Sequence, residues 1–150
     1  MVIKSEMSGR KIWIYRICII LLIIALVGSS LSLYHCKEKL NFIQNNIDDK
    51  FLYYYENFVS GIYCKDKGNP YSEEIALEMN RRIDLANAVF NQTTYFQREK
   101  FSELFVTLYA YCKTGEISSV MTTEIQYNLM EMIVRPDEKT AEEILKKIEK

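Results

Sequence analysis

Residues 16–39 read RICIILLIIALVGSSLSLYHCKEK, and this stretch decides in which compartment the rest of the chain folds. From Ile17 to Tyr34 no side chain is charged, which corresponds to about 27 Å of α-helix. The hydrocarbon core of a bilayer is about 30 Å thick, so this segment has the length of a transmembrane helix. Trp13 precedes the segment and Tyr34 ends it, which puts an aromatic ring at each membrane interface. The pattern predicts an uncleaved membrane span over residues 12–34.

The same stretch has an alternative interpretation as a signal peptide that is removed. The apolar run ICIILLIIALV covers residues 17–27, which is the length of the apolar region of a signal peptide. Cleavage after about Ser29 or Ser32 would release a secreted or periplasmic helical binding protein. We favour the anchor because the uncharged segment is long enough to cross the bilayer.

Basic residues on the two sides of the span predict its orientation. The N-terminal side carries the larger number, so the positive-inside rule favours a cytoplasmic N-terminus and an extracytoplasmic C-terminal domain in the cell membrane. The basic residues before the uncharged segment at 17–34 are Lys4, Arg10, Lys11 and Arg16, and those soon after it are Lys37 and Lys39. The predicted organisation is a cytoplasmic tail at 1–11, a transmembrane helix at 12–34, a juxtamembrane helix at 35–65 and an exported helical domain at 66–150.

Beyond the span, apolar residues recur at helical spacing and no stretch has the alternation of a strand. Four further helices are predicted after the juxtamembrane helix, which is counted as the first. The second follows Gly68 and begins at Pro70, and the third ends at Gly115 and has an inward face formed by Phe101, Leu104, Phe105 and Leu108. The fourth runs from about Ser119 to Val134 and stops before Pro136, and a short charged helix follows it. Capping boxes are predicted at Thr94 with Gln97 and at Thr140 with Glu143.

The first helix carries an apolar stripe that we expect to pack on its own domain. Its spacings are 3, 4 and 4, and it is formed by Leu40, Ile43, Ile47, Phe51, Tyr54, Phe58 and Ile62. The predicted fold is all-α: a single N-terminal transmembrane helix that continues into a small bundle of four to five helices.

Composition and motifs narrow the class of function. A formal net charge of −1 without a basic stripe argues against nucleic-acid binding. The single histidine, His35, lies at the membrane boundary, and no metal or cofactor motif is present in the sequence. The carboxylate pairs Glu73/Glu74 and Glu99/Glu103 lie on predicted helix surfaces, so a small carboxylate-dependent hydrolase is the weakest alternative. We therefore predict a protein that is not an enzyme, uses no cofactor and binds a protein partner, as an inhibitor, immunity or assembly factor does.

The four cysteines supply the candidate covalent sites. Cys64 and Cys112 lie at the ends of two predicted helices, where they would either pair in an oxidising compartment or remain two separately buried thiols. Cys36 is then left over beside the membrane, where it is a candidate for an intermolecular bond in a homodimer. Cys18 falls inside the predicted span. Small residues within the span, at Ala25/Ser29 and Gly28/Ser32, have the spacing that lets two helices approach closely.

Overall fold

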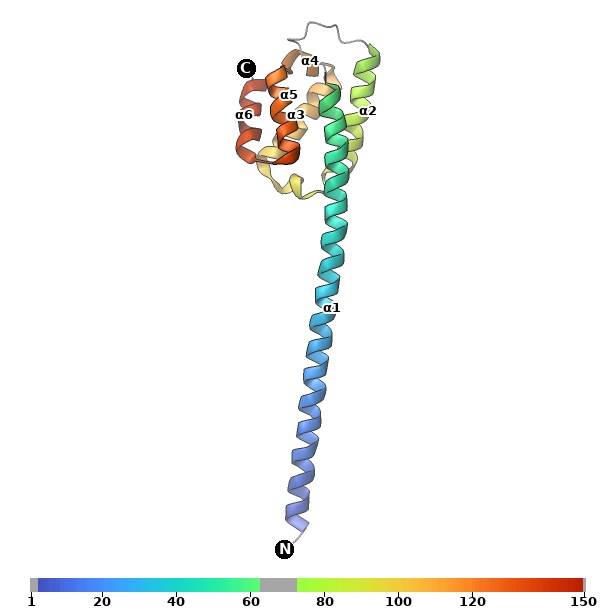
Figure 1. The fold of residues 1–150 in the computed structure, drawn as a ribbon, viewed down its shortest axis with the longest axis vertical. Helices are drawn as coiled ribbons and strands as arrows, with labels where there is room; N and C mark the ends of the chain where they lie inside the picture. Colours follow the sequence, from blue (N-terminus) through green and yellow to red (C-terminus); the bar gives the residue numbers. More distant parts are fainter. Residues whose placement is uncertain (1–2, 63–72, 150) are drawn as a thin grey trace. The chain divides into compact units, whose positions relative to one another are not determined.

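The computed structural model describes residues 3–62 and 73–149, and every regular element in these ranges is helical (Figure 1). This confirms the predicted all-α fold. One long helix comes first, and shorter helices follow it. The elements are α1 (Ile3–Gly61), α2 (Glu73–Phe90), the 3₁₀ helix η2 (Thr94–Gln97), α3 (Glu99–Thr114), α4 (Ile117–Val120), α5 (Thr123–Val134) and α6 (Glu138–Ile148).

The chain divides into two compact units, Met1–Ile43 and Gln44–Lys150. In the first unit every side chain from Ile12 to Ile43 is exposed, although most of them are apolar. Of the described helices, α1 is the one that is long and apolar enough to cross a membrane, by length and composition. Exposed apolar side chains on such a helix are what a lipid environment would cover.

The second unit is built around an aromatic cluster on the C-terminal part of α1. Phe51 is fully buried, and its ring lies 5.3 Å from that of Phe90 on α2 and 5.4 Å from that of Phe105 on α3. Phe90 and Phe105 approach each other at 4.2 Å between ring centroids. Tyr95 on η2 adds a fourth element to the same cluster, 5.6 Å from Phe51. These ring contacts join elements that are far apart in the sequence, so the cluster is the centre of the core.

Helix α3 runs through this core with the face that its spacing predicts. Phe101, Leu104, Phe105 and Leu108 are all buried, which confirms the predicted inward face. Gly115 ends the helix with a left-handed φ of 76°, and its N–H donates to Cys112 O at 3.1 Å. Only glycine adopts this conformation without steric cost, so the predicted glycine stop is also confirmed.

The C-terminal end of α1 is held by polar side chains from other helices. Gln126 on α5 donates through Nε2 to Val59 O at 2.8 Å and to Ile62 O at 3.0 Å. Arg82 on α2 donates to Asn57 O at 2.8 Å. Val59 O also accepts from Ile62 N, and Asn57 O also accepts from Ser60 Oγ, so these bonds add to local ones and tie α2 and α5 to the end of α1.

The two predicted N-cap residues were wrong, because in each case another residue caps the helix. Thr93, not Thr94, caps η2 and accepts from Phe96 N, while Thr94 bonds to Asp48 on α1. Asp137, not Thr140, caps α6.

The predicted fourth helix is divided in two. Met121 is extended, and the Thr122 side chain accepts from Ile125 N, so a new helix begins at Thr123. Ile117 and Met121 are both buried, with 1% and 0% of their surface exposed. The predicted stop before Pro136 is confirmed, because α5 ends at Val134. The predicted helix start at Pro70 lies outside the described residues.

The long apolar stripe on α1 divides at the boundary between the two units. Phe51, Phe58 and Ile62 are buried as predicted. Leu40 and Ile43 belong to the same stripe but are exposed, by 61% and 54% of their surface. The prediction that the whole stripe packs on its own domain is therefore wrong for its N-terminal part.

Candidate partner-binding groove

The candidate thiols lie in different environments. Cys36 is exposed on α1, while Cys112 is buried near the end of α3. Burial raises the pKa of the Cys112 thiol to about 11, because the thiolate would lose its hydration. Cys64 lies outside the described residues, so its bond to Cys112 stays a prediction.

The candidate acid–base groups remain on the surface. His35 Nδ1 lies 3.5 Å from a carboxylate oxygen of Glu38, one turn along α1, and both side chains are exposed. Glu103 pairs with Lys100 at 2.7 Å, and Glu99 is exposed beside them. Glu74 is exposed in the first turn of α2. Within the described ranges, no three His, Cys, Asp or Glu side chains come together as a metal site would require.

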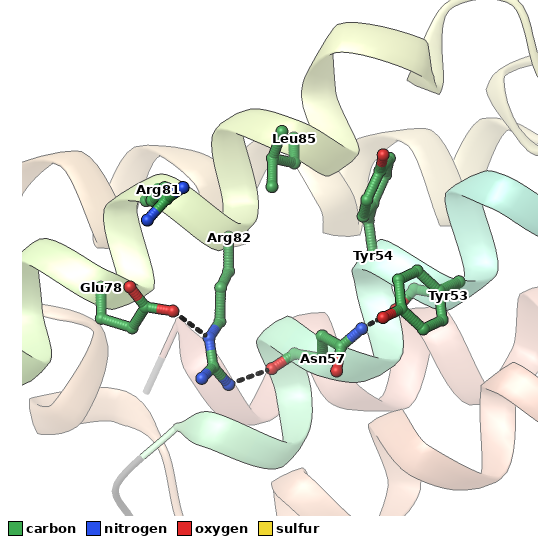
Figure 2. Close-up of a pocket in the computed structure, with 7 residues that line it drawn as sticks. All are labelled: Tyr53, Tyr54, Asn57, Glu78, Arg81, Arg82 and Leu85. Carbon is green, nitrogen blue, oxygen red and sulfur yellow. Dashed lines mark hydrogen bonds and ion pairs between the residues drawn. The ribbon is translucent and has the colours of Figure 1, made fainter.

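A solvent-filled groove lies between the C-terminal part of α1 and α2, with a volume of about 340 Å³ (Figure 2). Tyr53 and Tyr54 form its α1 side, and Leu85 with two arginines forms its α2 side. The full lining is Tyr53, Tyr54, Asn57, Glu78, Arg81, Arg82 and Leu85. All seven residues belong to the second unit, so the groove is a feature of that folded unit alone.

The floor of the groove is a fixed polar network. Arg82 Nε donates to Glu78 Oε1 at 2.9 Å, and Arg82 Nη1 donates to Asn57 O at 2.8 Å. Asn57 Nδ2 in turn donates to Tyr53 O at 2.8 Å, as the dashed lines in Figure 2 show. Because the guanidinium sits near the C-terminal end of α1, it also meets the negative end of that helix dipole.

Gly61 makes the close contact between the two helices feasible. A Cβ added there would collide with Met79 Cε and would lie 2.7 Å from Arg82 Nη1. Met79 is buried and Arg82 is held by two hydrogen bonds, so neither side chain is free to move away. A larger residue at this position would disturb the floor of the groove.

The outer rim of the groove is chemically different from its floor. Tyr53 and Leu85 are exposed by 62% and 43%. Arg81 is exposed and takes part in none of the hydrogen bonds or ion pairs found among the described residues. One turn before Arg81, Leu77 is exposed as well and lines a neighbouring hollow of about 700 Å³ that shares Arg81 and Leu85 with the groove.

The rim therefore offers apolar, aromatic and cationic groups side by side. Tyrosine and arginine are the residue types that contribute most to protein–protein interfaces. The groove has one carboxylate, Glu78, and an arginine already neutralises it. This arrangement fits recognition of a polypeptide surface better than acid–base chemistry, which needs a group free to exchange a proton.

Sequence reasoning did not find the groove. The one sequence feature that bears on the groove is the run of three tyrosines at residues 53–55. Aromatic residues on several faces of a helix predict burial, so this run did not indicate a groove. The structure buries only Tyr55 of the three and leaves Tyr53 and Tyr54 on the groove side. Loss of hydration raises the pKa of Tyr55 far above its usual value, so this phenol stays protonated in the core.

No protein family model, curated protein or solved structure matches this chain.

Proposed function

We propose that this chain is a single-pass membrane protein whose extracytoplasmic helical unit binds a protein partner through the groove between α1 and α2. The role is that of an inhibitor, an immunity protein or an assembly factor of the cell envelope. The observation that carries the proposal is the rim of the groove. There, exposed Tyr53 and Leu85 lie next to Arg81, which no described residue pairs with.

The chemistry of the rim suggests what the partner presents. Leu77 and Leu85 are two turns apart on one side of α2, so an apolar side chain of the partner could pack between them. Arg81 lies between these two leucines and would take a carboxylate or a helix C-terminus as its acceptor. An acidic, partly apolar helix or strand end meets both requirements.

A fixed floor supports this proposal because binding then requires little ordering. Arg82 and Asn57 are already hydrogen-bonded in the free protein, so their side chains lose no further freedom when a partner arrives. The tyrosine rings at the rim have few rotatable bonds, which lowers the entropic cost of the contact.

Site-specific photocrosslinking in intact cells tests the groove. A photoreactive phenylalanine analogue at Tyr53 should give an adduct with one partner, and the same analogue at Tyr127 should not. The two tyrosines are a matched pair, since they are exposed by 62% and 69%, and Tyr127 lies on α5 and does not line the groove. Adding Leu85→Glu should abolish the adduct, whereas Val106→Glu on α3 should leave it intact. Equal adducts from both tyrosines would contradict the assignment of the groove.

The anchoring and orientation belong to the same proposal. We propose that residues 12–34 span the membrane with Lys4, Arg10 and Lys11 in the cytoplasm, since α1 is long and apolar enough to cross it. Alkaline extraction should leave the intact chain in the membrane fraction, and protease added from outside should digest only the C-terminal unit. A shortened soluble chain would instead support the alternative of a diffusible protein after signal cleavage.

We also propose the Cys64–Cys112 bridge as part of this exported state. The bond would close a loop of roughly 49 residues and stabilise the unit by about 4 kcal/mol in the chain-entropy model. Labelling of unfolded protein with a maleimide, with and without prior reduction, tests it. Full labelling of both cysteines without reductant would show that the bridge is absent, and it would argue against export of the second unit.

A further inference from the structure

One face of α1, entirely within the first unit, is left exposed by the described part of the chain. Between the predicted end of the span at Tyr34 and the start of the folded unit at Gln44, Leu40 and Ile43 are exposed by 61% and 54%. They are large apolar groups on one side of a helix segment that is polar apart from Cys36 and Phe42. Phe42 is 68% exposed as well, but it lies on another side of the helix. Exposed apolar groups in such a setting usually mark an interaction surface.

The same face continues into the span. Counting back from Ile43 in steps of 3, 4, 4, 3 and 4 residues reaches Leu40, Cys36, Ser32, Ser29 and Ala25. At about 100° per residue these six positions fall within an arc of about 80° on the helix surface. We call them the pairing face: Ala25, Ser29, Ser32, Cys36, Leu40 and Ile43. All six side chains are exposed, and none of them is charged.

We infer that the pairing face binds the same face of a second copy of this chain, side by side in the membrane. The inference rests on the membrane anchoring proposed above. Copies inserted in one bilayer are parallel and lie at the same depth, so each residue of the face meets its own counterpart. A parallel pair thus brings Cys36 beside Cys36 and Ile43 beside Ile43.

The part of the pairing face inside the bilayer and the part in water favour self-association for different reasons. Inside the bilayer, lipid solvates apolar groups as well as a helix does, so close backbone approach at small residues supplies the contact. Ala25, Ser29 and Ser32 provide it, and the Ser29 hydroxyl donates to Ala25 O at 2.6 Å, so it needs no partner in the lipid. Outside the bilayer, Leu40 and Ile43 gain by leaving water.

Charges do not oppose the pairing. Lys37 and Lys39 flank the face on its two sides, and their flexible stems let the ammonium groups reach solvent. Glu38 points away from the face, where its carboxylate contacts His35. No charge of one copy therefore has to be buried against the same charge of the other.

The area that two pairing faces bury indicates whether the pair forms only within a membrane. From Ala25 to Ile43 the face is about 27 Å long and on the order of 10 Å wide, so two copies bury several hundred Å². A stable interface between freely diffusing proteins needs about 1,000 Å² or more. Anchoring in one membrane removes much of the translational and rotational freedom that association would otherwise lose. The pair should therefore form in membranes and separate when detergent dilutes the copies.

Helix geometry predicts Cα–Cα distances between the two copies, and these distances test the inference. For two parallel helices about 9–10 Å apart, the Cα atoms of paired residues are about 5–7 Å apart at positions 36, 40 and 43. At positions 41 and 42, on other sides of the helix, the same geometry gives about 12–13 Å. A disulfide needs a Cα separation of about 4.4–6.8 Å, so only the first three positions can form one.

Oxidation of single-cysteine variants in membranes tests this pattern. The background is the full chain with Cys18→Ser, Cys36→Ser, Cys64→Ser and Cys112→Ala, which by itself should give no dimer band. Position 36 is tested by restoring Cys36 in this background. Into it go Leu40→Cys or Ile43→Cys on the pairing face, and Asn41→Cys or Phe42→Cys off it. Phe42 is the matched control, since it is 68% exposed, more than either face residue. A diazene oxidant such as diamide takes up the two protons and two electrons that two thiols release as their bond forms.

We expect disulfide-linked dimers at positions 36, 40 and 43 to be at least about tenfold more abundant than at 41 and 42. Leu40→Lys in the otherwise unaltered chain should also lower the Cys36 dimer, while Phe42→Lys should not. Equal bands at all positions would indicate random collision and overturn the inference, as would the absence of dimers in a chain that stays in the membrane. Adducts with a different protein would assign the face to another partner. A chain that leaves the membrane on alkaline extraction would overturn the anchoring first, and the pairing with it.

Discussion

Replacing Phe51 by alanine tests the centre of the core. Phe51 is fully buried, and its ring contacts those of Tyr55, Phe90, Tyr95, Phe101 and Phe105 at centroid distances of 5.3 to 6.1 Å. A buried Phe→Ala change costs about 3–5 kcal/mol, through lost transfer free energy and the cavity left behind. Five ring neighbours place this site at the upper end, because each aromatic contact adds about 0.5–1.5 kcal/mol to area burial. We expect a loss of about 4–5 kcal/mol in the free energy of unfolding.

Urea unfolding of the full chain in detergent, followed by the near-ultraviolet circular dichroism of its tyrosines, measures this loss. With an m-value of about 2 kcal/mol per molar urea, the midpoint should fall by about 2 M. Total stabilities of about 5–15 kcal/mol are usual, so a variant unfolded without urea would also agree. Phe42→Ala is the control on the same helix, because Phe42 is 68% exposed and should change stability by less than about 0.5 kcal/mol. A loss below about 1 kcal/mol for Phe51, or equal losses for both, would refute the aromatic core.

Three further predictions concern other parts of the second unit. Leu108→Ala should lower the free energy of unfolding by about 2–5 kcal/mol, because Leu108 is fully buried. Val106→Ala, on the exposed face of α3, should leave this free energy nearly unchanged. Similar losses for the two variants would mean that α3 turns a different face to the core. In the reduced but folded chain, Cys112 should react with a maleimide at pH 8 more than about 100-fold more slowly than a thiol of ordinary pKa, since burial raises its pKa to about 11 and leaves little thiolate. Fast labelling of the reduced, folded chain would show that this end of α3 is open. Hydrogen bonds from Thr140, in the first turn of α6, hold the pKa of Asp137 below its ordinary value. The ionised carboxylate therefore stabilises the folded state fully above about pH 4, and this stabilisation is lost as the pH falls through the lowered pKa of the folded state. Asp137→Asn should therefore lower the melting temperature at pH 7, and this difference should shrink as the pH falls below about 4. A difference that stays constant as the pH falls would contradict the role of the charge.

Local signals in the sequence were sufficient for the helices and for most of the core. The period of apolar residues placed Phe101, Leu104 and Leu108 on one face of α3, because 3.6 residues per turn leave only one arrangement that buries them together. A glycine after a helical stripe has few alternatives to the left-handed cap, so Gly115 could also be read directly. The long uncharged run of α1 was equally plain, since its length must match the thickness of a bilayer if it is to span one.

The caps could not be read in the same way. Thr93 and Thr94 at the start of η2, and Asp137 and Thr140 at the start of α6, can each accept a backbone hydrogen bond. The choice fell on Thr93 and Asp137 because of contacts elsewhere: Thr94 is engaged by Asp48 from α1, and Arg98 holds Pro136 O at 2.9 Å just before α6. These partners lie more than 35 residues apart in the sequence, and no local pattern records them.

The sequence by itself determined that this chain is helical, that one segment has the length and polarity of a membrane span, and which side chains of α3 face inward. Those properties follow from spacing along one helix and from the transfer of apolar groups out of water. Only the tertiary structure decided that Tyr55 is buried while Tyr53 borders a groove, and that the apolar stripe of α1 is covered from Phe51 onward but uncovered at Leu40 and Ile43. Burial depends on which other element reaches a given face, and helical spacing carries no information about that neighbour.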